Sequence, residues 1–348
     1  MTVNAYIGWD IGGAHLKVAQ VDRTGKVIFA RQFATPLWQG IDILYQSLEK
    51  SRKLITEKSV RHAVTTTAEL VDIFPDRITG LTQLTECIAV ILDKDSIQYF
   101  SGKSGWVSTD GIAEFALQIA SANWYATASF IAKHIDHGLM LDIGSTTTDI
   151  IAFSNGRILN QGYSDYERLT SSELVYTGIV RTPVMALVQE LPVDSTWRPV
   201  IAEHFATMAD VYRLTGELRE EDDMLDTADR AGKSVLDSAR RLARMVGKDI
   251  YTGEAIQDWQ SVAQYIAETQ QNRILHACKR VLSNLQDNRE ITMVGAGAGR
   301  FLAAKLADCI DCRYLDFADI LEVADELKPS VGRSATAIAV AQLARLSD

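Results

Sequence analysis

The chain has 348 residues, enough for about two domains of roughly 150 residues each. Hydrophobic residues make up 47% and charged residues 23%, which is typical of a globular protein with a substantial core. The formal net charge of −10 argues against nucleic acid as a partner. A small anion is still compatible with this charge if backbone amides and a metal ion hold it locally.

The hydrophobic runs give no sign of a membrane protein. Asp10 interrupts the first apolar stretch and no basic segment precedes it, so we expect no signal peptide. No run approaches the ~20 apolar residues of a membrane-spanning helix. We therefore expect a cytoplasmic protein without a membrane partner, and a homo-oligomer is compatible with the sequence.

The N-terminal segment GWDIGGAHLKVAQVDRTGKV, which begins at Gly8, predicts a strand, a tight acidic turn, a second strand, a hairpin turn and a third strand. The pattern returns from Leu141 as LDIGSTTTDIIAFSNGRIL. Asp10 matches Asp142, and Gly12 matches Gly144. A repeated unit of this kind predicts two similar lobes.

Between the two copies, helical spacing follows Pro36, and the strand-like segment RHAVTTTAEL comes next. Further helical patterns cover residues 81–92, 111–120 and 124–135. The order βββαβα is that of an RNase-H-like unit. We assign residues 1–136 to a first such lobe and 137–348 to a second.

The second lobe contains a long charged segment, about 191–288, that predicts a helical insertion over a cleft. Its acidic stretch LREEDDMLDTADR lacks the ligand spacing of an EF-hand, which favours a solvated loop or helix end. The β pattern resumes with EITMVGAGAGRFLAAKLA, and an apolar helix at 333–346 could pack on the first lobe. The fold class is therefore α/β, with two RNase-H-like lobes and a helical insertion in the second.

The two Asp-x-Gly turns predict a phosphate site between the lobes. Glycine lets the backbone approach an anion, and consecutive N–H groups bind one. Asp10 and Asp142 would repel phosphate, so their natural role is to hold Mg²⁺ beside it, with Asp149 as a third carboxylate. For Asp149, His15 and Lys17 a purely structural position is an equal alternative. The candidate phosphate-binding residues are Gly12, Gly13, His15, Lys17, Gly144, Ser145, Thr146, Thr147 and Arg181.

Three further features are candidates for the same cleft. The turn with Gly295, Gly297 and Gly299 predicts nucleotide or substrate binding, with tight strand–helix packing as the alternative. Glu69 ends a strand, where it suits a general base or a helix cap equally. Glu173 and Arg181 lie in SSELVYTGIVRTPV, and Arg181 offers a bidentate fork for an anion. Glu69, Glu173, Asp10 and Asp142 form the candidate catalytic set.

These motifs resemble the acetate kinase/sugar kinase/Hsp70/actin superfamily, with IGWDIGGAHLK and LDIGSTTTDI as its two phosphate loops and VGAGAGR as its nucleotide turn. Within it the chain resembles the hydantoinase/oxoprolinase group. The segments NWYATA, ELVYTGIVRTPVMA and FATMADVYRLTGEL further resemble the tetrahydromethanopterin-linked C1-transfer proteins of methylotrophic bacteria. These proteins are similar to archaeal enzymes of methanofuran biosynthesis.

The resemblance implies a transferase that joins an aminomethylfuran-methyl diphosphate to the phenol of tyramine or glutamyl-tyramine and releases diphosphate. It implies Mg²⁺ as cofactor without a requirement for ATP, and Glu69, Glu173 or His15 as the base for the phenol. Gly13, Ala14 and His15 depart from the small hydroxyl residues usual in the first loop, which weakens the expectation of ATP binding. The alternatives are an ATP-dependent small-molecule kinase, a hydantoinase-like amidohydrolase or a non-catalytic nucleotide switch.

Overall fold

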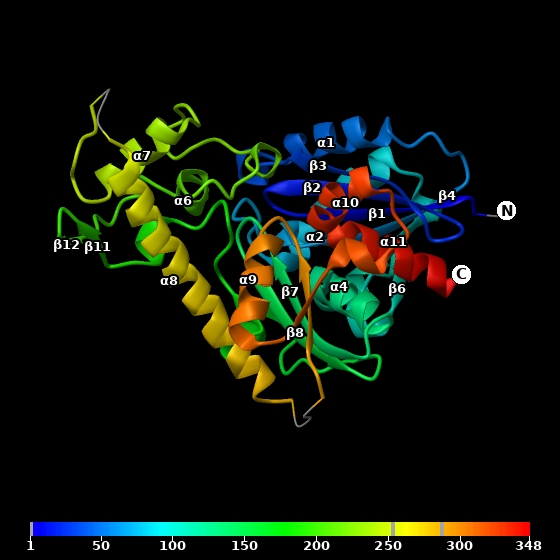
Figure 1. The fold of residues 1–348 in the computed structure, drawn as a ribbon. Coiled ribbons are helices and arrows are strands. Elements are labelled where there is room, and N and C mark those ends of the chain that lie inside the picture. Colours follow the sequence, from blue (N-terminus) through cyan, green and yellow to red (C-terminus); the bar gives the residue numbers. More distant parts are fainter. Residues whose placement is uncertain (1–2, 252–254, 286–288) are drawn as a thin grey trace.

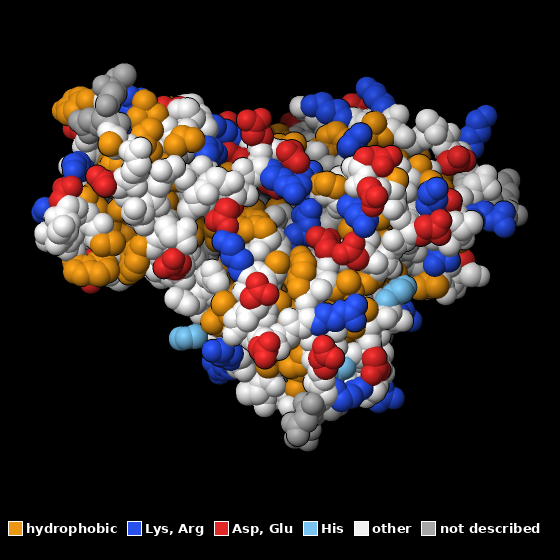
Figure 2. All heavy atoms as spheres, in the orientation of Figure 1, with side chains coloured by type: hydrophobic (Ala, Val, Ile, Leu, Met, Phe, Trp, Pro, Cys, Tyr) orange, Lys and Arg blue, Asp and Glu red, His pale blue; other side chains and the backbone are white. Residues whose placement is uncertain are grey.

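Two mixed β-sheets organise the molecule, and helices cover their outer faces and fill the space between them (Figure 1). The computed structural model describes residues 3–251, 255–285 and 289–348. The predicted end of the insertion at 288 therefore lies outside the described residues. Figure 2 shows acidic and basic side chains mixed over the face in view, and apolar side chains gathered at the outer end of the insertion.

The first sheet has the strand order β3-β2-β1-β4-β5-β6. The first three strands pair in antiparallel fashion, and β4 and β5 join them in parallel. The strands β5 and β6 were not predicted, because four and three residues are too few to show an alternating pattern. The strands are β1 (Ala5–Ile11), β2 (His15–Asp22), β3 (Val27–Ala34), β4 (Val60–Thr66), β5 (Ile97–Phe100) and β6 (Trp106–Ser108).

The second sheet repeats the first three-strand arrangement, with the order β10-β8-β7-β13-β14 and β9 paired to β8. In β1–β2 Asp10 lies opposite Lys17, and in β7–β8 Asp142 lies opposite Asp149. The two hairpins that repeat in the sequence thus also pair in the same register. The α/β fold class is confirmed. The strands are β7 (His137–Ile143), β8 (Thr148–Ser154), β9 (Arg157–Ile158), β10 (Leu174–Val175), β13 (Thr292–Ala296) and β14 (Arg313–Asp316).

Most helices outside the insertion follow the predicted pattern, whereas the short helices α5 and α10 were not predicted. The segments 81–92, 111–120 and 124–135 form the greater parts of α2, α3 and α4. The helix α2 begins where the Asp76 carboxylate accepts the Thr79 backbone N–H. None of the described helices has the length and hydropathy of a membrane span. The helices are α1 (Asp42–Arg52), α2 (Arg77–Ile91), α3 (Ile112–Ile119), α4 (Asn123–Ala132), α5 (Asp165–Ser171), α9 (Arg300–Ile310), α10 (Lys328–Arg333) and α11 (Ala335–Ser347).

The insertion contains a two-stranded sheet, β11 (Glu190–Val193) and β12 (Thr196–Pro199), in addition to helices. Capping boxes begin its first two helices, α6 (Met208–Leu214) and α7 (Val235–Arg244). The long helix α8 (Gln257–Leu282) then runs back along the second lobe (Figure 1). The hairpin β11–β12 was missed because all four residues of β12 are exposed and show no apolar alternation.

The helices α4 and α11 lie between the two sheets, where one apolar cluster joins both lobes. The helix α11 contacts β1, β2 and β4 of the first lobe. Its backbone comes so close that a β-carbon at Gly8 would lie 1.7 Å from the Ala337 carbonyl oxygen. The C-terminal helix therefore packs directly on the strand that carries Asp10, and this packing positions the first acidic turn.

We predict that Gly8→Ala destabilises the protein by more than about 3 kcal/mol, because the new methyl group overlaps backbone that cannot retreat. The control Gly216→Ala lies in open space at a φ of +78° and should cost about 1 kcal/mol from backbone strain alone. Chemical denaturation of both variants measures the difference. Equal losses would show that the approach of α11 does not constrain β1.

Candidate functional site

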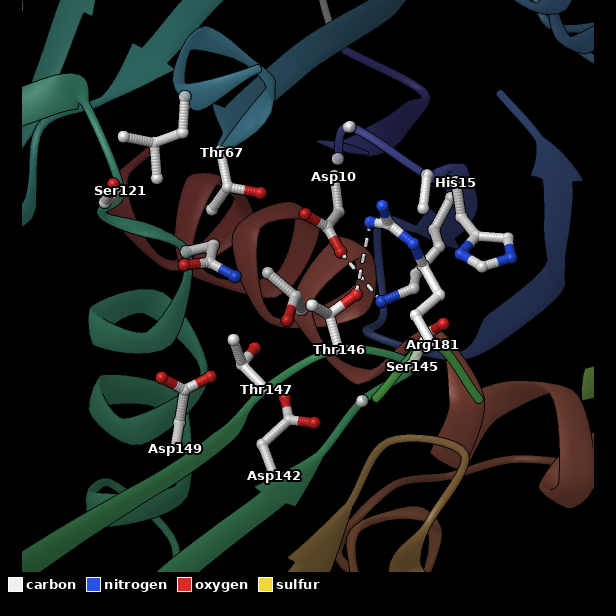
Figure 3. A pocket seen from close by; sticks show the side chains of 18 of the residues that line it. Asp10, His15, Thr67, Ser121, Asp142, Ser145, Thr146, Thr147, Asp149 and Arg181 are labelled. Carbon is white, nitrogen blue, oxygen red and sulfur yellow. Dashed lines mark hydrogen bonds and ion pairs between the residues drawn. The ribbon is translucent and has the colours of Figure 1, made fainter. Parts of the chain in front are cut away.

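A cavity of about 600 Å³ lies where the two Asp-x-Gly turns face each other. Figure 3 shows Asp10 and His15 of the first turn opposite Asp142, Ser145, Thr146 and Thr147 of the second. Every predicted phosphate-binding residue lines this cavity: Gly12, Gly13, His15, Lys17, Gly144, Ser145, Thr146, Thr147 and Arg181. Their role as phosphate ligands remains a prediction.

Both turns have the same backbone geometry. The Gly12 N–H donates to the His15 carbonyl over 2.9 Å, and the Gly144 N–H donates to the Thr147 carbonyl over 2.9 Å. Each turn is thus a closed four-residue loop between paired strands. In the second turn the carbonyls of Gly144 and Ser145 also accept the backbone N–H groups of residues 179–181. Both turns are therefore held in place before any ligand binds.

Lys17 provides the positive charge at the centre of the site. Its Nζ lies 3.1 Å from Asp10 Oδ2, and the Asp10 residue is 4% exposed. Burial alone would lower the pKa of Lys17, but the carboxylates of Asp10, Asp142 and Asp149 outweigh burial and raise it. Lys17 therefore stays charged and faces carboxylates of both lobes.

Asp142 has no ion pair within the described part of the chain, although it lines the cavity. Burial raises the pKa of its carboxyl to about 7; Lys17 opposes this shift, and Asp149 and Asp10 reinforce it. The ionisation of a carboxyl whose pKa lies near neutral pH changes readily when a charged ligand binds beside it. A perturbed acid of this kind in a cavity is typical of a functional site.

Asp149 is engaged by Arg168, which is 2% exposed and donates to its Oδ1. The Arg168 guanidinium also lies over the Trp124 ring, with Cζ 4.2 Å from the ring centre. Burial still raises the pKa of Asp149, although Arg168 opposes the shift. This carboxylate is therefore fixed by a buried cation on the side wall of the cavity.

The predicted metal role of Asp10, Asp142 and Asp149 stays a prediction, and the structure limits the form it can take. Within the described residues no three His, Cys, Asp or Glu side chains are grouped closely enough to hold a metal ion by themselves. Asp10 and Asp149 are each held by a cation instead. Mg²⁺ commonly binds through one or two carboxylates together with substrate phosphates, and the oxygens of Asp10, Asp142, Thr146 and Thr147 fit such shared binding.

Two buried polar atoms on the turns have no hydrogen-bond partner among the described residues. They are His15 Nε2 and Ser145 Oγ, one from each turn. Burial, with help from Lys17 and Arg181, lowers the pKa of His15 to about 3, so its imidazole is neutral and carries one N–H. Buried polar groups are normally paired, and both atoms belong to residues that line the cavity, so a bound ligand is their natural partner.

The candidate bases Glu69 and Glu173 do not line the cavity. Glu69 is 1% exposed and accepts hydrogen bonds from the Ser121 N–H at 2.9 Å and from the Thr66 hydroxyl at 3.0 Å. Glu173 accepts the N–H groups of Gln161 and Gly162 at 2.6 and 2.9 Å. Both carboxylates thus accept hydrogen bonds from loop backbone away from the cavity lining, and their role as a base stays a prediction.

The glycine turn after β13 is also used for packing. A β-carbon at Gly297 would lie 2.3 Å from the Ile143 carbonyl, and one at Gly299 would lie 2.5 Å from the Ile143 side chain. The Gly297 and Gly299 N–H groups donate to the Gly332 and Ile143 carbonyls. Gly295 contacts Tyr314. Of this turn Ala298 lines the cavity, which agrees with the packing alternative for Gly295, Gly297 and Gly299; their role in nucleotide or substrate binding stays a prediction.

Several residues of the wall were not predicted. The acidic stretch of the insertion is not solvated throughout, because Asp222 is 4% exposed and lies 2.5 Å from Arg333 Nε. Ser121, which Glu69 holds, and Asn123 of the segment NWYATA line another side. The remaining unpredicted lining residues include Trp38, Thr67, Asp72, Asp165, Arg168 and Thr336. These lining residues lie far apart in the sequence, so no local pattern groups them. Ser121 has a positive φ of 55°, which a serine does not indicate in a sequence.

Comparison with known proteins places the chain in a family. A family profile described as Hydantoinase/oxoprolinase matches residues 61–345. The chain belongs to the hydantoinase/oxoprolinase family. A solved structure of acetone carboxylase, described as nucleotide-free, aligns with 97% of this chain and 70% of its own. The TM-score of 0.56 at 9% identity shows that this member of the hydantoinase/oxoprolinase family and acetone carboxylase share a fold.

Two archaeal relatives carry the same name, "(4-{4-[2-(gamma-L-glutamylamino)ethyl]phenoxymethyl}furan-2-yl)methanamine synthase". The relative from Methanocaldococcus jannaschii is 30% identical over 244 residues, which are 70% of this chain and 72% of that protein. The relative from Methanococcus vannielii is 32% identical over 124 residues, which are 35% of this chain and 55% of that protein.

We predict that Asp142→Asn makes the protein more stable above neutral pH. The folded-state pKa of about 7 lies above the unfolded value of 3.8, so the free energy of unfolding of the native protein falls as pH rises between these values. The variant lacks this loss and should gain roughly 1–4 kcal/mol at pH 8 but little at pH 4. Denaturant titrations across this range measure the gain.

The matched control is Asp110→Asn, because Asp110 is exposed and pairs with Lys94 on the surface. Its effect should stay below about 1 kcal/mol at every pH in the series. A constant difference between Asp142→Asn and the native protein across this pH range would contradict the raised pKa of Asp142.

Proposed function

We propose that this protein forms an aryl–furfuryl ether in the assembly of a methanofuran-type cofactor. It would join an aminomethylfuran-methyl diphosphate to the phenol of tyramine or glutamyl-tyramine. The observation that carries the proposal is the 30% identity, over 72% of its length, to a synthase whose name describes a phenoxymethyl-furan product. The cavity between two anion-binding turns supports it, because such a reaction needs a place for a departing diphosphate.

The proposed reaction is a substitution at the furfuryl carbon. A bond forms between the phenol oxygen and this carbon, and the bond from the carbon to the diphosphate oxygen breaks with its electron pair. The phenol proton passes to an oxygen of the departing diphosphate. The furan ring stabilises positive charge at the carbon, so the protein contributes mainly by stabilising negative charge on the leaving group.

Four donors around the cavity suit that task. Lys17 and Arg181 supply positive charge, one from each lobe. The Ser145 hydroxyl can donate a hydrogen bond, and His15 Nε2 donates one in the tautomer that carries its proton there; neither atom has a partner among the described residues. Because the turns are already closed by their own hydrogen bonds, these donors need little reorganisation when a diphosphate binds.

A divalent cation is part of the proposal because the cavity is rich in carboxylates. Asp10, Asp142 and Asp149 face it, and Lys17 and Arg168 are the cations that oppose them most directly. Asp10 and Asp142 would hold Mg²⁺ together with the diphosphate, and the ion would neutralise charge on the leaving group. Asp142 would take part in its ionised form, so diphosphate binding with Mg²⁺ should strengthen as pH rises toward 7.

The alternatives that use ATP have less support in the site. The glycine turn at residues 295–299 is occupied by packing against Ile143 and by a hydrogen bond to the Gly332 carbonyl. A kinase of this fold would need that turn to approach a nucleotide. The ether-forming reaction needs only the two turns that line the cavity.

We predict that the protein with Mg²⁺ converts aminomethylfuran-methyl diphosphate and γ-glutamyltyramine or tyramine to the aryl ether and diphosphate. Mass spectrometry detects the ether, and a coupled assay measures diphosphate release. Asp10→Asn should lower kcat/KM by about 10²-fold or more and raise the Mg²⁺ concentration needed for half activity, because one carboxylate ligand is lost.

The surface variant Asp110→Asn again serves as the control and should leave both quantities unchanged. The proposal is wrong if the protein yields no ether from either phenol. Hydrolysis of ATP, or transfer of its phosphate to a small molecule, in the same preparation would then return the protein to the kinase or amidohydrolase class.

A further inference from the structure

A second cavity of about 720 Å³ adjoins the first. Four residues line both cavities and therefore mark the opening between them: Trp38, Thr146, Tyr176 and Arg181. The other lining residues of the second cavity come from the segment around Pro36, from the segment 180–186 that follows β10, and from the insertion. The second cavity thus lies between the first lobe and the insertion, beside the phosphate turns.

Arg181 occupies the opening between the cavities. Its Cζ lies 4.4 Å from the centre of the Trp38 ring, and its Nη1 donates to Thr146 Oγ1 over 3.4 Å. Figure 3 shows Arg181 beside Thr146 and His15. One side of the guanidinium therefore meets an aromatic ring and the other meets the second turn. A molecule in the second cavity reaches the diphosphate site past this residue.

The wall of the second cavity suits a flat ring with a polar tail. Trp38 and Tyr176 are 36% and 58% exposed, so their rings have surface available to a ligand. Small or apolar side chains form much of the remaining wall: Pro36, Val180, Pro183, Ala186, Ala209, Leu225 and Ala228. Asp226, Arg230 and His204 add charged or polar groups from the insertion. This mixture matches a phenol that carries amine or carboxylate groups.

The insertion segment between the cavities is anchored where it begins. Asp222 lines the first cavity and pairs with Arg333 of α10, 2.5 Å away. The next residue, Asp223, lines the second cavity and pairs with Arg213 and Lys233. Consecutive carboxylates thus anchor this segment to the second lobe and to the insertion. The wall of the second cavity is consequently preformed.

Given the proposed function, we infer that the second cavity binds the phenolic acceptor. The phenol ring lies against Trp38 and Tyr176, and its amine or glutamyl tail extends along residues 223–230. The phenol oxygen meets the furfuryl carbon at the opening beside Arg181, bonds to it as the carbon–diphosphate bond breaks, and gives its proton to the diphosphate. The first cavity holds the furan diphosphate, so the two substrates have separate sites.

The test fills the second cavity without touching the phosphate turns. Ala186→Trp and Ala228→Trp both place an indole at its wall. Each should raise the KM for γ-glutamyltyramine at least 10-fold and change the KM for the furan diphosphate less than twofold. The control Ala113→Trp lies on the exposed side of α3 and outside both cavities, and it should leave both constants unchanged.

Each outcome decides between the two proposals. In one outcome, the native protein forms the ether while Ala186→Trp and Ala228→Trp both keep the KM for γ-glutamyltyramine within twofold of the native value. This result would overturn the inference that the second cavity binds the acceptor, and it would leave the proposed function unaffected. If the two variants instead raise the KM for the furan diphosphate, the second cavity binds that substrate, and the inference is also overturned. A native protein that makes no ether overturns the proposed function and this inference with it. If one variant fails to fold by circular dichroism, the other decides.

Discussion

Buried carboxylates beside the two turns outnumber the cations that pair with them, Lys17 and Arg168. The electrostatics of the site depend on this excess of negative charge. Asp10 is paired with Lys17, and Asp149 is paired with Arg168. Asp142 is left to share Lys17 at longer range, so burial raises its pKa to about 7. Removing carboxylates from water is costly unless each finds a cation. A site with this excess of negative charge binds a diphosphate only together with further positive charge, which explains why the proposed function includes Mg²⁺.

The fold provides the positions that this balance requires. The helices α4 and α11 fill the space between the sheets and place the two hairpins opposite each other. The contact of Gly8 with Ala337 fixes the strand below Asp10, and the contact of Gly297 with Ile143 fixes the strand below Asp142. Close backbone approaches at two glycines thus determine the geometry of the site. The insertion closes the cavity from the side through Asp222 and Arg333.

The sequence was sufficient to predict the duplicated hairpins, because an alternating pattern and a short turn determine register. It therefore placed Asp10 and Asp142 in equivalent positions, whereas the pairing of Lys17 with Asp10 is known from the structure. It did not predict the direction in which Glu69 and Glu173 point, because their partners are backbone groups elsewhere in the fold. The pairing of Asp222 with Arg333 joins residues more than 100 positions apart, which no local pattern reveals. Strand and turn patterns thus located the site, and tertiary contacts decided which acids serve it.

The most direct test of the central claim, that the two turns hold the diphosphate of a furan substrate, is calorimetry in the presence of Mg²⁺. Aminomethylfuran-methyl diphosphate and ATP are titrated separately into the native protein and into His15→Ala and Ser145→Ala. We expect the furan diphosphate to bind, each variant to weaken this binding by about 10-fold through loss of one hydrogen bond, and ATP to give no comparable signal. Tight binding of ATP with no binding of the furan diphosphate would contradict the account.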